Sequence, residues 1–122
     1  MCIRDSGLGV CHGGIVFTLA DTAMAYGSNA TDDAAFSTTA TIDWLRPTRA
    51  GARLSATSTR VAGRGRSDIH DIVVTDETGA TIALVRGQTL STGRPVTQLA
   101  AEAEDARVST EHASSAPTEG AE

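Results

Sequence analysis

The chain lacks the features of several protein classes: it has only two cysteines, no long hydrophobic run and no N-terminal targeting pattern. Cys2 and Cys11 offer neither a disulfide framework nor a zinc knuckle. No apolar stretch reaches the ~20 residues of a membrane-spanning helix. No basic region followed by an apolar segment opens the chain. We therefore expect a protein of the reduced cytoplasm with no membrane partner.

Excess positive charge is also missing, which bears on possible partners. The formal net charge of the 122 residues is −5. Residues 1–94 hold nine acidic and nine basic side chains, whereas residues 95–122 hold six acidic side chains against Arg107 alone. A neutral body with an acidic end argues against nucleic acid or an anionic membrane as a partner. The length fits one domain with a single core.

Residues 15–30 form the longest apolar segment, and Asp21 is its only charged residue. Apolar side chains recur there at helical spacing and also lie off that stripe, so we expect a helix that is buried nearly all round. The helix should begin at Gly13 or Gly14 and end near Ser28 or Asn29. Its predicted stripe consists of Val16, Leu19, Ala20, Ala23, Gly27 and Ala30.

The region after this helix predicts four strands, over residues 35–46, 52–62, 67–75 and 80–91. These segments contain many β-branched residues and alternate, the second more weakly, between turn signals such as Asp-Glu-Thr-Gly at 76–79. One long helix followed by short-linked strands is typical of an α+β domain with an antiparallel sheet. We expect Phe36 and Trp44 in its core and His70 on its surface.

The composition changes at both ends of this domain. Met1 to Ser6 shows no periodicity and leads into a Gly-Leu-Gly loop signal. From Gly93 onward, small and polar residues replace the apolar periodicity. We therefore predict an irregular leader over residues 1–6, a folded domain over residues 7–94, and an acidic tail over residues 95–122 that is disordered or loosely helical.

Two features of the predicted helix point to chemistry. Gly13 and Gly14 lie where a loop becomes a helix, so their N–H groups can face an anion as in an oxyanion hole, although such a pair can also be a simple turn. A carboxylate in a buried helix is costly to desolvate unless it is paired or open to a wet cleft. Asp21 is thus either hydrogen-bonded to Thr18, Thr22 or the backbone, or a nucleophile or general base aimed at a carbonyl.

The spacing of these features restricts how they can act together. Gly13 and Asp21 are eight residues apart, which is ~12 Å along a helix. One carbonyl group cannot touch both within one chain. Two antiparallel copies of the helix would bring the Gly13 end of one beside Asp21 of the other, twice by symmetry. A catalytic role therefore predicts a homodimer with active sites at the interface.

The helix segment resembles the signature of the hotdog-fold acyl-CoA thioesterases of the phenylacetate-degradation type. Residues 11–26 are Cys-His-Gly-Gly-Ile-Val-Phe-Thr-Leu-Ala-Asp-Thr-Ala-Met-Ala-Tyr. The family's order and spacing continue in Thr-Ile-Asp-Trp-Leu-Arg-Pro at 41–47, Gly-Arg-Ser at 65–67 with Asp71, and Ala-Leu-Val-Arg-Gly at 83–87. The resemblance implies a hotdog fold, an antiparallel sheet wrapped around one long central helix, paired into dimers or dimers of dimers.

This resemblance also implies an activity and residue roles. The activity is hydrolysis of aromatic or medium-size acyl-CoA without a cofactor or metal, since coenzyme A is part of the substrate. Asp21 would be the nucleophile or the base that activates water, and the Gly13 N–H would polarise the thioester carbonyl. His12 would orient the site. Thr39, on a strand of the partner subunit, would lie near the attacking water.

The remaining site predictions concern substrate binding. Although Phe36 and Trp44 are expected in the core, an aromatic acyl group could contact one of them. Gly14 belongs to the same loop as Gly13. Arg64 and Arg66 flank a glycine and suit coenzyme A phosphates through the guanidinium fork, although solvated arginines at a turn would show the same pattern. Ser6 stands where the family has an asparagine that contributes to the site. The family's first strand is missing ahead of the motif, so we expect a hotdog fold that lacks this strand.

Other functions stay open on the sequence alone. The chain could bind an acyl-CoA without hydrolysing it, or be an inactive truncated fragment. A dehydratase fits less well, because the proline-rich loop of those enzymes does not follow His12. The spacing of the three histidines fits no metal site.

Overall fold

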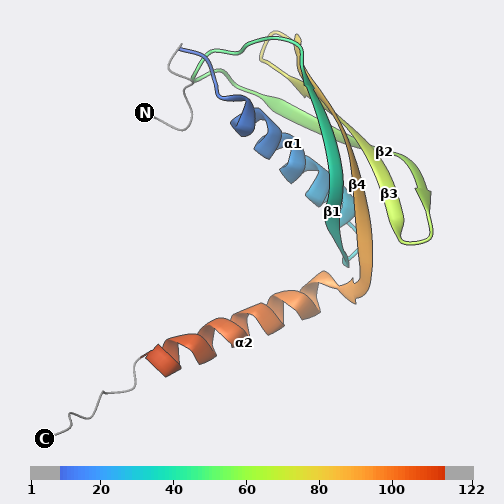
Figure 1. The fold of residues 1–122 in the computed structure, drawn as a ribbon, viewed down its shortest axis with the longest axis vertical. Coiled ribbons are helices and arrows are strands. Elements are labelled where there is room, and N and C mark those ends of the chain that lie inside the picture. The colour runs from blue at the N-terminus through green and yellow to red at the C-terminus, as the bar shows by residue number, and fades with distance from the viewer. Residues whose placement is uncertain (1–8, 115–122) are drawn as a thin grey trace, which may run out of the picture.

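The computed structural model describes residues 9–114 as two helices and four strands (Figure 1). The predicted leader over residues 1–6 lies outside the described residues. In chain order the elements are α1 Gly13–Ser28, β1 Asp33–Trp44, β2 Ser55–Arg64, β3 Ser67–Thr75, β4 Thr81–Pro95 and α2 Val96–Ser114. The predicted bounds of α1 and of the third strand are confirmed, whereas the other strands are shifted or extended by two to four residues.

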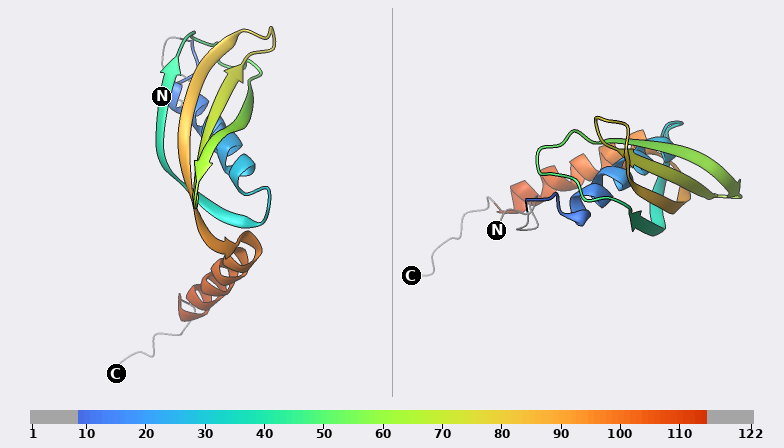
Figure 2. Two further views of the ribbon diagram at one scale, coloured as in Figure 1. Left: turned by 90° about the vertical axis from the view of Figure 1, so that its right-hand side faces the viewer. Right: turned by 90° about the horizontal axis from the view of Figure 1, so that it is seen from above.

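The strands form one sheet in the order β1-β4-β3-β2, and each neighbouring pair is antiparallel. Helix α1 lies across one face of this sheet, and α2 extends away from its end (Figures 1 and 2). The predicted α+β architecture, with an antiparallel sheet around one long helix, is confirmed. Because β1 stands at one edge of this four-stranded sheet, one side of its backbone has no neighbouring strand among the described residues.

The core lies between α1 and the sheet. Val16, Ala20 and Met24 follow one another at intervals of four along the helix, and each is at most 2% exposed. They pack against a buried cluster on β3 and β4, formed by Ile72, Val74, Ile82, Ala83 and Val85. Burial of these apolar side chains holds the helix on the sheet.

The prediction that α1 is buried nearly all round is wrong. Thr18, Thr22 and Ala25 are exposed on the helix, and Tyr26 is 78% exposed. The physical reason is that a single sheet covers only one side of the helix. Met24, placed off the predicted stripe, is fully buried because the helix crosses the sheet along its row of every fourth residue.

Three side chains are placed differently from the prediction. Phe36 and Trp44, expected in the core, are 62% and 54% exposed. Both belong to the edge strand β1, where no layer of the described structure covers them. His70, expected on the surface, is 3% exposed, because its position in β3 points it toward α1.

Helix α2 stands where the sequence predicted an acidic tail that is disordered or loosely helical. Its start is held by Asp32, which lies in the turn between α1 and β1. The Asp32 carboxylate accepts hydrogen bonds from the Thr97 N–H and hydroxyl at 3.1 Å each, and the Val96 N–H donates to the Asp32 carbonyl at 3.2 Å. A carboxylate at the first turn caps a helix and complements its dipole.

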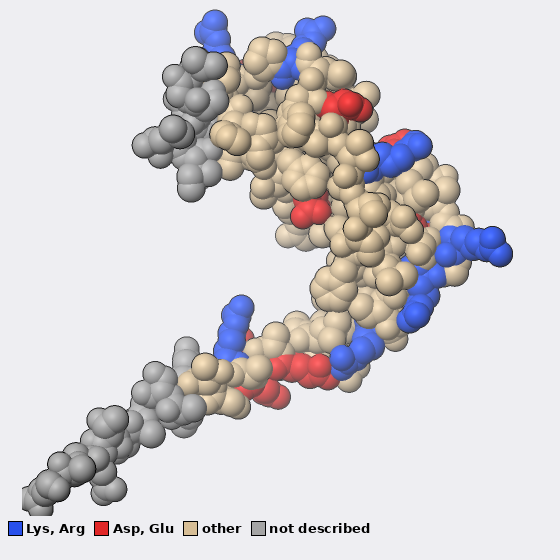
Figure 3. Space-filling view, viewed as in Figure 1, with Lys and Arg blue, Asp and Glu red and all other residues tan. Residues whose placement is uncertain are grey.

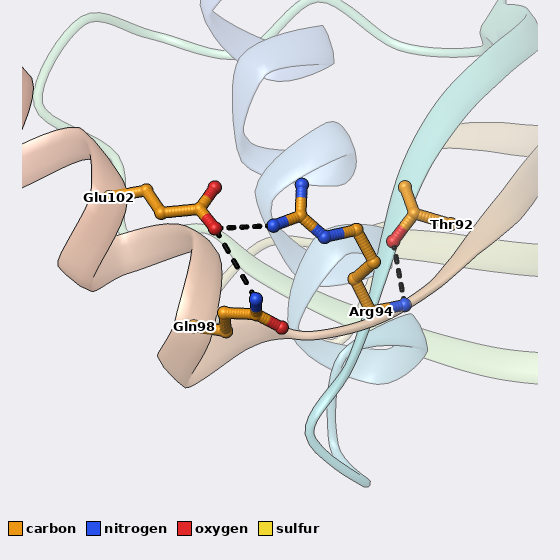
Figure 4. A network of polar contacts seen from close by, with 4 residues as sticks. All are labelled: Thr92, Arg94, Gln98 and Glu102. Atoms are coloured by element: carbon orange, nitrogen blue, oxygen red, sulfur yellow. Dashed lines mark hydrogen bonds and ion pairs between the residues drawn. The ribbon is translucent and has the colours of Figure 1, made fainter.

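A second set of contacts ties α2 to the end of β4 (Figure 4). The Arg94 guanidinium forms an ion pair with Glu102, whose carboxylate also accepts from the Gln98 side chain at 3.3 Å. The Arg94 N–H donates to the Thr92 hydroxyl at 3.2 Å. Within residues 9–114, neither this helix nor α1 has the length and hydropathy that crossing a membrane requires.

The sheet face opposite α1 carries a bidentate ion pair. Arg86 Nε donates to Asp71 Oδ1 at 2.6 Å, and its second nitrogen donates to Oδ2 at 2.7 Å. The two residues lie directly opposite each other on β4 and β3. The hydrogen bonds from Arg86 lower the pKa of Asp71 below its ordinary value of 3.8.

Replacing Met24 with alanine should lower the free energy of unfolding by about 2–5 kcal/mol, because it empties a fully buried site between helix and sheet. Urea unfolding followed by circular dichroism measures this loss. Thr22→Ala, at an exposed position of the same helix, is the control and should change stability by no more than about 0.5 kcal/mol. Equal losses in the two variants would contradict the described core.

The Asp71–Arg86 pair predicts a specific response to acid. A carboxyl group with a lowered folded pKa stabilises the fold above its ordinary pKa, and this contribution is lost as the pH falls through the folded value. Asp71→Asn should therefore slightly lower the urea midpoint at neutral pH. The gap to the wild type should close below pH 3.8. In an Arg86→Gln background, which lacks the ion pair, Asp71→Asn should show no such convergence.

Candidate functional site

The N-terminus of α1 leaves one backbone amide without an acceptor among residues 9–114. His12 precedes the helix in an extended conformation and caps it with two groups. Its Nδ1 accepts a hydrogen bond from the Gly14 N–H at 3.2 Å, and its carbonyl accepts from the Ile15 N–H at 2.9 Å. The first N–H groups of a helix have no acceptor within the helix itself. The Gly13 N–H, which neither cap group takes, is therefore the amide that this terminus can offer to a ligand.

An apolar groove of about 570 Å³ opens beside this amide. It lies between the start of α1 and the end of β1, and its walls are His12, Gly13, Gly14, Phe17, Ala40, Ile42 and Trp44. A free N–H at the wall of an apolar groove suits a carbonyl group attached to an apolar body. The helix dipole favours the negative charge that such a carbonyl oxygen gains in acyl transfer.

Asp21 lies two turns further along α1 and is half-buried. Its Oδ1 accepts a hydrogen bond at 3.1 Å from the Ser37 hydroxyl on β1. The partners predicted from the sequence do not contact it, because the Thr18 and Thr22 hydroxyls donate to the carbonyls of Gly14 and Thr18, at 2.8 Å each. A hydroxyl that holds one carboxylate oxygen orients the group and leaves the other oxygen available.

Gly13 and Asp21 belong to one continuous helix, so their separation of ~12 Å follows from the helical rise. Thr39, predicted at the site, is exposed on β1. An irregularity of the β1–β4 pairing falls between Ser37 and Thr39, and within one chain it is Ser37 that contacts Asp21. The role given to Thr39 concerns the strand of a partner subunit and stays a prediction.

The arginines predicted to bind phosphate lie away from Gly13 in the same chain. Arg64 and Arg66 are exposed at the hairpin between β2 and β3. This hairpin lies at the same end of the sheet as Asp21. Ser37, which contacts Asp21, lies opposite Thr89 on β4, and Thr89 lies opposite Asp68 near the start of β3. Ser6, the remaining predicted binding residue, lies outside the described residues.

Sequence reasoning missed three residues near these groups. Ser37 was hidden in a run of serine and threonine residues that offers no reason to single it out. Trp44 was predicted in the core or against an aromatic acyl group, and its contact with Gly13, where Nε1 donates to the carbonyl at 3.1 Å, was missed. His70 Nδ1 lies 3.4 Å from the Ser58 hydroxyl, and among residues 9–114 its Nε2 has no hydrogen-bond partner. The described residues contain no cluster of three potential metal ligands.

Comparison with known proteins gives a family match over most of the domain. Residues 8–83 match the family described as the Thioesterase superfamily. Over 88 residues the chain is 42% identical to the acyl-coenzyme A thioesterase PaaI of Escherichia coli K12, a match that covers 71% of this chain and 62% of the relative. The chain thus spans less than two thirds of that relative's length.

Solved structures agree with the hotdog architecture. The PaaI protein of the phenylacetic acid degradation operon of E. coli superposes with a TM-score of 0.73 and 38% identity, over 75% of this chain and 67% of that one. The TT0310 protein of Thermus thermophilus gives a TM-score of 0.66 and 32% identity, over 72% and 73%. A hypothetical thioesterase of Streptococcus pneumoniae with coenzyme A, 18% identical with a TM-score of 0.71 over 75% and 74%, shares the fold.

Proposed function

Because the chain belongs to the thioesterase superfamily, we propose that it hydrolyses acyl-CoA thioesters and that Gly13 and Asp21 perform the chemistry. The observation that carries this proposal is the N-terminus of α1. The Gly13 N–H is the amide left over when His12 caps the helix, and Gly13 lines an apolar groove. The relative from E. coli, named an acyl-coenzyme A thioesterase, supports the same reaction class.

In this mechanism the thioester carbonyl oxygen accepts a hydrogen bond from the Gly13 N–H while the acyl group occupies the groove. Asp21 either attacks the carbonyl carbon or takes a proton from the water that does so. The negative charge that forms on the carbonyl oxygen is stabilised by the Gly13 amide and the helix dipole. The carbon–sulfur bond then breaks, and the thiolate of coenzyme A takes up a proton. Where a water molecule is the nucleophile, the acyl group leaves directly as the free acid. Where Asp21 is the nucleophile, a water molecule then hydrolyses the acyl–Asp21 anhydride, which releases the acid and restores the carboxylate.

We propose that each site is shared by two subunits, since Gly13 and Asp21 of one helix cannot reach the same carbonyl. Strand β1 offers an unpaired edge in the described sheet, and a long edge strand is normally paired or covered. Two-fold antiparallel pairing of β1 centred between Ala40 and Thr41 would place Trp44, and with it Gly13, beside the partner's Ser37 and Asp21.

The surface around α1 is consistent with such an interface. Figure 3 shows uncharged side chains over most of this face, with basic side chains at the top of the molecule, along its right-hand edge and over α2. Exposed Tyr26 and Phe36 add large apolar area next to the helix and the β1 edge. A dimer, or a dimer of dimers, would remove this area from water.

The substrate proposal follows from the groove and the hairpin. Phe17, Ile42 and Trp44 provide walls for an aromatic or medium-size acyl group. Gly14 also lines the groove. Its N–H is not available to the substrate, because it donates to His12 Nδ1. Arg64 and Arg66 are the candidate contacts for the phosphates of coenzyme A, since their guanidinium groups are exposed and suit bidentate phosphate binding.

Asp21→Asn should lower kcat for hydrolysis of phenylacetyl-CoA by about 10³-fold or more, because the amide is neither a nucleophile nor a base. Released thiol, measured with a chromogenic disulfide, reports the rate. Thr22→Ala, on the exposed side of the same helix, is the matched control and should keep the wild-type rate. Hydrolysis by Asp21→Asn at the wild-type rate would refute the mechanism. Binding of phenylacetyl-CoA by the wild type without turnover would favour a binding protein.

The shared site predicts complementation between two inactive variants. Gly13→Pro removes the N–H at the first helical position and also places a Cβ against the Trp44 ring, so it should lower kcat by at least about 10²–10³-fold. A heterodimer of this variant with Asp21→Asn combines one intact Asp21 with one intact Gly13 at one of its two sites. Purified through two different tags, it should recover about half of the wild-type activity. Only the sum of the two residual activities would be found if each chain held a complete site.

A further inference from the structure

We propose that Trp44 is a positioning residue, which holds the Gly13 peptide so that its N–H points into the groove. This inference rests on the proposed thioesterase function, in which that N–H binds the carbonyl oxygen. The sequence indicates why the Gly13 peptide needs a side chain to fix its orientation. Two consecutive glycines begin α1, and glycine leaves the backbone free to adopt many orientations. The first turn of a helix also frays more readily than its middle.

Trp44 contacts Gly13 in two ways. Its Nε1–H donates to the Gly13 carbonyl at 3.1 Å. Its ring also lies against the Gly13 Cα, because a Cβ built there would meet Nε1 at 3.0 Å and Cε2 at 3.1 Å. The indole therefore acts on the peptide both as a hydrogen-bond donor and as a wall, and Gly13 is the residue that leaves room for it.

The peptide between Gly13 and Gly14 is held at both ends. Its carbonyl accepts from Trp44, and its N–H donates to His12 Nδ1 at 3.2 Å. A peptide unit is planar, so these two hydrogen bonds set its orientation. The preceding unit, which carries the Gly13 N–H, is joined to it at the Gly13 Cα. Fixing one plane therefore restricts the direction in which the free N–H points.

A role in simple core packing does not account for Trp44. The side chain is 54% exposed, and it is absent from the buried cluster between α1 and the sheet. It instead lines the groove together with Phe17 and Ile42. The same ring thus touches the peptide that presents the donor and the space assigned to the acyl group. Groups that bind a reacting carbonyl need placement to a fraction of an ångström, which such a contact supplies.

The first experiment replaces Trp44 with phenylalanine, which keeps an aromatic wall and removes the N–H donor. We expect kcat for phenylacetyl-CoA to fall by about 10-fold or more while KM changes by less than about 3-fold, because the ring still lines the groove. Hydrogen–deuterium exchange of the Gly14 amide, which donates to His12 Nδ1, should become faster. Leu45→Ala, the adjacent residue with the same exposure of 54%, is the control and should leave both readouts unchanged.

The two readouts separate this inference from the proposed function. If the wild type hydrolyses the thioester and Trp44→Phe keeps its kcat, the positioning role is overturned, whatever the exchange rates. An unchanged exchange rate at the Gly14 amide would overturn the proposal that Trp44 holds this peptide, with or without activity. If the wild type is inactive toward every acyl-CoA tested, the proposed function fails, and so does the catalytic role of Trp44. Faster amide exchange in Trp44→Phe would still show that Trp44 orders the Gly13–Gly14 peptide.

A second pair of variants tests the contact between ring and glycine. Gly13→Ala keeps the N–H but places a Cβ against the indole, so kcat should fall. In a Trp44→Ala background this Cβ has room, and the additional effect of Gly13→Ala should be at least several-fold smaller than in the wild-type background. Independent effects, which multiply when the two changes are combined, would overturn the proposed contact.

Discussion

The burial of one row of α1 side chains against the sheet determines where the two proposed reacting groups, Gly13 and Asp21, lie. Val16, Ala20 and Met24 fix both the rotation of the helix and its position along the strands. Because Gly13 and Asp21 are on the same helix, this packing brings the first beside the end of β1 and the second beside Ser37. A helix rotated by one residue would break both contacts while keeping its secondary structure.

The single sheet explains the exposed apolar residues. One layer of strands covers one side of α1, and β1 remains an edge strand among the described residues. Tyr26, Phe36 and Trp44 are therefore solvent-accessible in the isolated chain. The helix terminus and the carboxylate lie next to the same edge. The proposed pairing of two chains would therefore have two effects. It would cover exposed apolar surface, and it would bring Gly13 of one chain beside Asp21 of the other.

The bounds of the helix could be predicted to within a residue, and those of the third strand to the residue, because their ends carry local signals. These are Gly13-Gly14 and Asn29 for the helix and tight turns for the strand. Helix α2 could not, since the residue that caps it, Asp32, is 65 positions from Thr97 in the sequence. The burial of His70 and the choice of Ser37 rather than a threonine as the partner of Asp21 likewise depend on how α1 crosses the sheet. Alternation within a strand shows which residues share a face, but not which of them a helix reaches.

Trp44 is the only tryptophan of the chain. Its indole lines the groove and lies against Gly13, so the intrinsic fluorescence of the protein originates at the proposed reaction centre. Events in the groove and at the helix terminus share one optical signal that needs no added label. The protein therefore contains its own reporter for ligand entry, placed by the same contact that orders the glycines.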